Sequence, residues 1–239
     1  MRYFINIIYN GYNYYGFQKQ KKKNTIEKIL ESSINKILKK NIKIIPCSRT
    51  DKLVNSFNFY MHFDIDIFLK NNFINVLNKI LPIYIQIKDI FLVKNELHAR
   101  YSVINRSYLY IINLNKNPFL YKKSYFLNRK INYKKMLLIT EIIKNIKNFK
   151  YFTTKNIKNN NICNIYSIKW FIVNENFLFF YIKANRFLKF MIRSIIGVIL
   201  KISTNKISFN KFFFLLKNKK YFIKYLLPSY ALYLLDVKY

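Results

Sequence analysis

The strongest constraint on the fold is the order in which strand-like and helix-like patterns alternate over the first hundred residues. Apolar side chains recur at every second position in some segments and at helical spacing in others. The predicted elements are strand 2–9, helix 25–40, strand 42–46, strand 58–63, helix 68–81 and strand 85–93. This β-α-β-β-α-β order is that of a ferredoxin-like split unit.

The alternation starts again near residue 100. A strand is expected within 101–114, followed by helix 133–146, an exposed Asn/Lys-rich loop over 155–161, hairpin strands 165–173 and 177–184, helices 187–202 and 209–216, and a final strand 230–239. The hairpin is indicated by two apolar strands that flank Asn174-Glu175-Asn176. We therefore predict an α+β fold with two halves, residues 1–100 and 101–239.

The charge of the chain is strongly positive, with 43 basic and 10 acidic residues and a formal net charge of +33. Such a surface favours a polyanionic partner such as RNA. However, Lys, Asn, Ile, Tyr and Phe are all abundant together, which is the pattern of an AT-rich coding genome. The charge alone therefore leaves both explanations open.

The same bias makes the scarce residues informative. The chain has three glycines, Gly11, Gly16 and Gly197, and its seven arginines stand among 43 basic residues. A retained arginine suggests that the planar guanidinium is needed, since lysine would otherwise serve. A retained glycine suggests a backbone position that a side chain would block.

Several classes of protein are excluded by what the sequence lacks. No apolar run is long enough for a membrane span, and the N-terminal residues do not read as a secretory signal. Two cysteines, Cys47 and Cys163, make neither a disulfide framework nor a zinc site. With His62 and His98 as its two histidines, both interpreted as structural, the chain is expected to hold no metal. The lack of a disulfide framework indicates a reduced, cytoplasmic protein.

Asp51 is the most informative acidic residue. It ends the stretch Cys47-Ser48-Arg49-Thr50-Asp51, and it is one of five aspartates in 239 residues. An arginine two positions earlier favours the ionised carboxylate. A lone aspartate at such a place also commonly makes a turn or caps a helix, so the neighbouring motifs have to decide.

Those motifs resemble the TruA type of tRNA pseudouridine synthase, and they occur in order over nearly the whole chain. The matching stretches are Tyr9-Asn10-Gly11 through Gln20, Ser48 to Asp51, His62-Phe63, His98 to Ser102, Arg106 to Tyr110, Phe187 to Gly197, and Pro228 through Leu234. The resemblance implies a pseudouridine synthase fold, with a central mixed, mainly antiparallel sheet and a cleft between two ferredoxin-like-derived halves.

The resemblance also implies an activity and four site residues. The family isomerises uridine to pseudouridine in the anticodon stem-loop of tRNA, typically at positions 38 to 40. Asp51 would be the nucleophile, Tyr108 would pack against the target base, Arg193 would pair with Asp51, and Arg49 would help to displace the base and contact the RNA. No metal, nucleotide or redox cofactor is needed. The resemblance further implies a homodimer that binds tRNA across both subunits.

The sequence departs from the family pattern immediately after Asp51. Where the family has A-G-V-H, this chain has Lys52-Leu53-Val54-Asn55, so two small residues are replaced by large ones. We expect the loop to follow a different path there. The alternatives to an active enzyme are a catalytically decayed tRNA-binding protein or an RNA chaperone that uses the same surface. A ribosome-associated basic protein is disfavoured.

Overall fold

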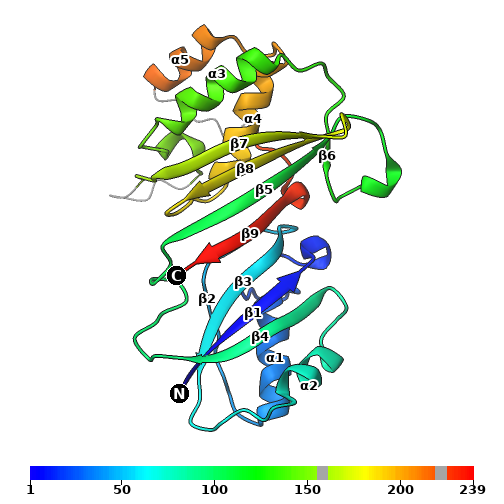
Figure 1. Ribbon diagram of the computed structural model, residues 1–239, viewed down its shortest axis with the longest axis vertical. Coiled ribbons are helices and arrows are strands. Elements are labelled where there is room, and N and C mark those ends of the chain that lie inside the picture. Colours follow the sequence, from blue (N-terminus) through cyan, green and yellow to red (C-terminus); the bar gives the residue numbers. More distant parts are fainter. Residues whose placement is uncertain (155–160, 219–224) are drawn as a thin grey trace. The chain divides into compact units, whose positions relative to one another are not determined.

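The computed structural model describes residues 1–154, 161–218 and 225–239, which form two compact units (Figure 1). The first unit comprises Met1–Arg106 together with Tyr233–Tyr239, and the second comprises Ser107–Leu232. The last seven residues therefore belong to the unit that also contains the N-terminus. Most of the loop predicted over 155–161 lies outside the described residues.

The sheet of the first unit has the ferredoxin-like order. Its strands are β1 (Arg2–Tyr9), β2 (Ile45–Pro46), β3 (Asn55–Asp64) and β4 (Ile85–Val93). They lie in the order β4-β1-β3-β2, and each neighbouring pair is antiparallel. Helix α1 (Ile26–Leu38) follows β1, and α2 (Phe73–Ile80) follows β3. The predicted β-α-β-β-α-β order is confirmed.

The edge of β3 is shared by two short partners. Its distal part pairs with β2, where Ile45 faces His62. Its first residues pair in parallel with β9 (Leu232–Lys238), where Asn55 faces Tyr233. The final strand is thus an addition to the ferredoxin-like sheet, placed beside the residues that follow Asp51.

Two elements of the first unit are shorter than predicted. The predicted strand 42–46 is reduced to β2, because the preceding backbone bonds to side chains of α1: the Ile42 amide donates to Asn35 Oδ1 at 2.7 Å, and the Ile44 amide donates to Glu31 Oε1 at 3.2 Å. Helix α2 begins at Phe73 rather than residue 68, and the Leu69 amide donates instead to the Tyr3 hydroxyl at 3.2 Å.

The core of the first unit lies between α1 and the sheet. Ile26, Leu30 and Ile34 are fully buried and recur every fourth residue along α1. Phe17 stacks on Phe59 of β3 with ring centroids 4.3 Å apart. Burying each of these side chains contributes about 1.5–3 kcal/mol, so the segment around Phe17 is held tightly to the sheet.

The second unit combines a sheet with three helices. Its strands are β5 (Asn105–Asn113, which starts at the unit boundary), β6 (Tyr125–Phe126), β7 (Ile165–Val173) and β8 (Phe177–Ala184). The order is β5-β8-β7, with β6 beside β5 in parallel. Helices α3 (Tyr133–Lys144), α4 (Met191–Ser203) and α5 (Phe209–Lys217) lie together against it (Figure 1).

The hairpin of β7 and β8 has the predicted bounds, and Asn174 and Glu175 turn it with φ angles of 48° and 53°. Helix α4 begins at Met191 rather than residue 187, because Phe190 at φ 65° is left-handed and cannot continue a helix. Short 3-10 turns cover Gly11–Asn13, Pro118–Leu120, Lys150–Phe152 and Ser229–Ala231. Helices and a mixed, mainly antiparallel sheet confirm the predicted α+β class.

The helices in the described parts of the chain are too short or too polar to cross a membrane.

The core of the second unit is centred on α4, where Ile195, Ile196 and Ile199 are fully buried. This helix also packs on α3. Its burial on nearly all sides explains the almost continuous apolar character of its sequence.

Candidate active site

Asp51 lies in the loop that joins β2 to β3, and its side chain is half-buried. The loop turns directly after it, since the Val54 amide donates to the Asp51 carbonyl oxygen at 3.2 Å. The third residue of this turn, Leu53, has a φ of 68°. That is the left-handed conformation of a type II turn, which glycine favours.

The backbone on both sides of Asp51 is held by the segment that follows β1. The Phe17 amide donates to the Thr50 carbonyl at 3.2 Å, and the Leu53 amide donates to the Tyr14 carbonyl at 3.3 Å. The Tyr9 hydroxyl and Thr50 Oγ1 share a buried hydrogen bond of 2.8 Å. Residues 9–17, which lie far from Asp51 in the sequence, therefore fix the position of the loop that carries the carboxylate.

Two glycines make this close approach possible. A Cβ on Gly16 would lie 2.7 Å from the Thr50 carbonyl oxygen, and Gly16 has a φ of 90°. A Cβ on Gly11 would lie 2.1 Å from the Val54 carbonyl oxygen. The two glycines thus pack their backbones against the two ends of the Asp51 turn. The prediction that the retained glycines mark positions closed to side chains is confirmed here.

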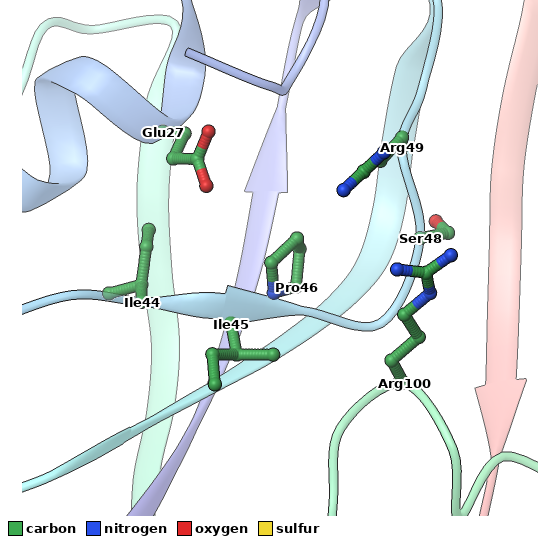
Figure 2. Close-up of a pocket in the computed structure, with 7 residues that line it drawn as sticks. All are labelled: Glu27, Ile44, Ile45, Pro46, Ser48, Arg49 and Arg100. Carbon is green, nitrogen blue, oxygen red and sulfur yellow. The ribbon is translucent and has the colours of Figure 1, made fainter.

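Arg49 is exposed and lines a pocket of about 220 Å³ on the first unit (Figure 2). The pocket is also bordered by Glu27 at the start of α1 and by residues 44–46, Ser48 and Arg100. Burial raises the pKa of the Glu27 carboxyl, and the Arg49 charge partly opposes that rise. The Glu27 carboxylate also accepts a hydrogen bond from the Lys19 amide.

The two histidines hold a turn beside this pocket. His62 is fully buried, and its Nδ1 accepts a hydrogen bond from the Ala99 amide at 3.1 Å. His98 Nδ1 accepts from the Arg100 amide at 3.1 Å, and the two imidazoles pack edge to face at 4.8 Å. These contacts agree with the structural role predicted for both histidines.

Tyr108 lies in β5 of the second unit, and its ring is buried edge-on against Phe187 at 5.2 Å. Two residues along the strand, the Tyr110 hydroxyl donates to the Pro228 carbonyl at 2.9 Å. Burial raises the pKa of Tyr110 well above its usual value, so this hydroxyl stays protonated as a donor. Three of the sequence motifs of the second unit therefore meet around β5.

Arg193 lies in the first turn of α4 and donates from Nε to the Leu227 carbonyl at 2.7 Å. Gly197 is one helical turn further on, and a Cβ there would lie 1.8 Å from the Tyr225 carbonyl oxygen. The segment before β9 therefore runs directly on the helix surface. Gly197 allows this approach, which brings the Leu227 carbonyl within reach of the guanidinium.

The four predicted site residues are thus distributed over both units. Asp51 and Arg49 are anchored in the first unit, and Tyr108 and Arg193 are anchored in the second. Among the described residues, no three Asp, Glu, His or Cys side chains lie together in a way that could hold a metal ion.

Two residues with clear positioning roles begin matched motifs but were not among the four predicted site residues. Tyr9 supports Thr50, and Arg106 Nη2 donates to the Cys47 carbonyl at 2.6 Å, just before Ser48 and Arg49. A signal for Arg106 was present, because it is one of seven arginines retained among 43 basic residues. Tyr9 is one of 21 tyrosines, so the composition of the chain gave no such signal for it.

Comparison with known proteins defines the class. Residues 145–239 match the family model described as tRNA pseudouridine synthase. A tRNA pseudouridine synthase A from Azobacteroides pseudotrichonymphae is 34% identical over 241 residues, covering 100% of this chain and 96% of the relative. That from Phytoplasma mali is 36% identical over 216 residues, covering 88% of this chain and 86% of the relative. The class is therefore that of the isomerases that form pseudouridine.

The chain belongs to the tRNA pseudouridine synthase A family. A further relative, from Dictyoglomus turgidum, is 30% identical and covers 98% of both chains. Among solved structures, the archaeal box H/ACA Nop10–Cbf5 complex aligns with 83% of this chain and 42% of that chain, at 12% identity and a TM-score of 0.36. A likeness of that size adds nothing to the family assignment.

Proposed function

We propose that this protein converts uridine to pseudouridine in the anticodon stem-loop of tRNA, at positions 38 to 40, with Asp51 as the nucleophile. The observation that carries the proposal is the clamping of the Asp51 turn by Gly11 and Gly16, which lie in the N-terminal motif. A carboxylate held on both sides by backbone packing is more tightly placed than a surface turn requires. Relatives that are named tRNA pseudouridine synthase A and align over 96% and 98% of their own length support the substrate class.

The reaction needs one carboxylate and a closed environment. The bond between C1′ and N1 of the uridine breaks, the uracil rotates, and a bond between C1′ and C5 forms. The C5 proton is lost and N1 gains a proton, so the product is an isomer. The Asp51 carboxylate can attack C1′, attack the base, or take part in a glycal pathway, and each route uses it in its ionised form.

The other three residues have supporting roles in this proposal. Tyr108, fixed by Phe187, would pack against the uracil ring. Arg193, oriented by the Leu227 carbonyl, would pair with the carboxylate and keep it ionised. Arg49, exposed beside the loop, would help to displace the base and contact the RNA backbone. Extruding a base costs a few kcal/mol, which contacts to phosphate must offset.

The decisive experiment replaces the nucleophile. Asp51→Asn keeps the size of the side chain and removes the carboxylate, so pseudouridine at positions 38 to 40 should vanish while tRNA binding persists. Asp89→Asn, on the outer strand β4, is the matched control and should leave product formation unchanged. Carbodiimide mapping of the tRNA reads out each position. Unchanged product from Asp51→Asn would overturn the role of this residue.

The second candidate is a catalytically decayed tRNA-binding protein or RNA chaperone that uses the same basic surface. The replacement of two small residues by Lys52 and Leu53 next to the carboxylate favours it. Mapping tRNA from cells that lack the protein separates the two, because full modification at 38 to 40 in those cells assigns the reaction to another enzyme. A cytoplasmic homodimer remains the proposed form, and size measurement in solution tests the dimer.

A further inference from the structure

A small pocket on the first unit is lined by two arginines that come from different segments. Arg49 precedes Asp51 by two residues, and Arg100 lies in the turn after β4. Both guanidinium groups face the pocket, with Ser48 beside them (Figure 2). Within the described residues, neither guanidinium makes a hydrogen bond or an ion pair with the protein. Their donors are therefore available to a ligand.

Two cations beside one pocket are unfavourable unless an anion lies between them. The planar guanidinium matches the oxygen geometry of phosphate and is the preferred group for binding it. Both positions also keep arginine in a chain where seven arginines stand among 43 basic residues. The pair therefore has the chemistry of an oxyanion site rather than of a generally basic surface.

A third arginine, Arg106, fixes the backbone segments that carry Arg49 and Arg100. Arg106 Nη2 donates to the Cys47 carbonyl at 2.6 Å and to the Arg100 carbonyl at 3.3 Å. One side chain thus ties the segment that carries Arg49 to the turn that carries Arg100. The Tyr239 hydroxyl also donates to the Ala99 carbonyl at 2.8 Å, inside the same turn. Such preorganisation lowers the entropy cost of binding at the pocket.

Glu27 limits where an anion can sit. Its carboxylate lies on the side of the pocket away from Arg100, so an anion is repelled from that side (Figure 2). The attractive position is between Arg49, Arg100 and the Ser48 hydroxyl. One phosphate group fits the number and geometry of these donors, whereas a neutral base would bring no negative charge to the two guanidinium groups.

We propose that Arg49, Arg100 and Ser48 bind one backbone phosphate of the RNA substrate, and that Arg106 positions the two arginines. This assignment rests on the proposed function only in taking RNA as the polyanion. A phosphate held two residues from Asp51 would fix the strand next to the carboxylate. The contact would add affinity without reading sequence, as contacts to the nucleic acid backbone do.

A double-mutant cycle tests the shared phosphate. Arg49→Gln and Arg100→Gln should each weaken tRNA binding about tenfold and lower the salt slope of log K by roughly one. If both bind the same phosphate, the double variant should lose little more than either single variant. Arg129, an exposed arginine of the second unit, is the matched control. Arg49→Gln with Arg129→Gln should be additive.

Arg106→Lys keeps the charge but not the Nη2 group that donates to both carbonyls. It should weaken tRNA binding while leaving the salt slope near that of the wild type, since no phosphate contact is removed outright. An equal loss of slope would place Arg106 on the RNA itself and overturn its positioning role. Circular dichroism and thermal unfolding of each variant exclude misfolding as the cause.

The outcomes separate this proposal from the proposed activity. Additive or negligible effects of Arg49→Gln and Arg100→Gln, with pseudouridine still formed, overturn the phosphate site alone. Strong coupling without any pseudouridine supports the site and rejects the activity. A second arm titrates inorganic phosphate at constant ionic strength. Millimolar phosphate binding that Arg100→Gln abolishes, with tRNA affinity unchanged, would assign the pocket to a free anion and overturn the RNA contact.

Discussion

His62 should make the first unit sensitive to mild acid. The imidazole is fully buried in β3, and its Nδ1 accepts from the Ala99 amide, so the neutral form is the one that fits. The other nitrogen, Nε2, has no hydrogen-bond partner in the described structure. Burial, together with the charge of Arg2, lowers the pKa of His62 from 6.5 to about 4.

The sign and size follow from this pKa. Because the folded-state value is below that of the unfolded chain, the unfolded state takes up the proton first as the pH falls. The contribution of neutral His62 to the free energy of unfolding is therefore fully present above pH 6.5, declines below it, and is lost below about pH 4. A difference of about 2.5 pKa units corresponds to roughly 3 kcal/mol in total, of which about 2 kcal/mol is lost by pH 5.

Urea unfolding at pH 7.5 and pH 5.0 measures the effect against His62→Asn, which keeps an acceptor for the Ala99 amide but does not titrate. The variant should be less stable at pH 7.5 and should lose much less between the two pH values. Asp64 does not confuse this window, because Arg2 holds its pKa below the usual range. Equal losses in both proteins would refute the assignment of acid sensitivity to His62.

Four further changes follow from the packing around the site. Gly16→Ala should cost roughly 2–4 kcal/mol by thermal unfolding and abolish pseudouridine formation, because its Cβ would meet the Thr50 carbonyl at 2.7 Å. Tyr9→Phe should cost about 1–2 kcal/mol and slow turnover, since the buried hydroxyl of Thr50 loses its partner. Gly197→Ala should destabilise more than Lys201→Ala, at a half-buried position of α4, and unchanged stability of Gly197→Ala in urea unfolding would contradict the close approach seen there. Leu53→Val should be about 1 kcal/mol less stable than Leu53→Gly, and the reverse order would contradict the left-handed turn.

Most of the fold could be predicted because its signals are local. The β7–β8 hairpin was placed correctly at both ends, since strong alternation meets a turn of three polar residues. The predicted strand over 42–46 was too long, because Asn35 and Glu31 of α1 take up backbone donors that a strand partner would otherwise use. That competition depends on how the helix packs, and periodicity carries no information about it.

The candidate site was predictable in a different way. Asp51 and Arg49 are close in sequence, so one short motif identified both. Their support comes from Tyr9, Gly16 and Arg106, which reach the same loop from other parts of the first unit. Residues that act by packing on a distant backbone leave only an indirect trace in a single sequence, namely that a scarce residue type is kept. The glycines showed that trace, and the tyrosine did not.

Leu53 shows what the departure after Asp51 means physically. A different loop path is expected from the bulky residues after Asp51, and one of them, Leu53, adopts a φ of 68°, the conformation that glycine supplies in a type II turn. A leucine there costs about 1–2 kcal/mol, and the turn persists because its neighbours impose it: the Leu53 amide is bonded to the Tyr14 carbonyl, and Gly11 packs on the next residue. Strain that persists in this way next to a carboxylate argues that the position of Asp51 is being kept at the expense of stability. A loop released from catalysis would have no reason to retain it, so the turn favours the enzyme over its decayed alternative.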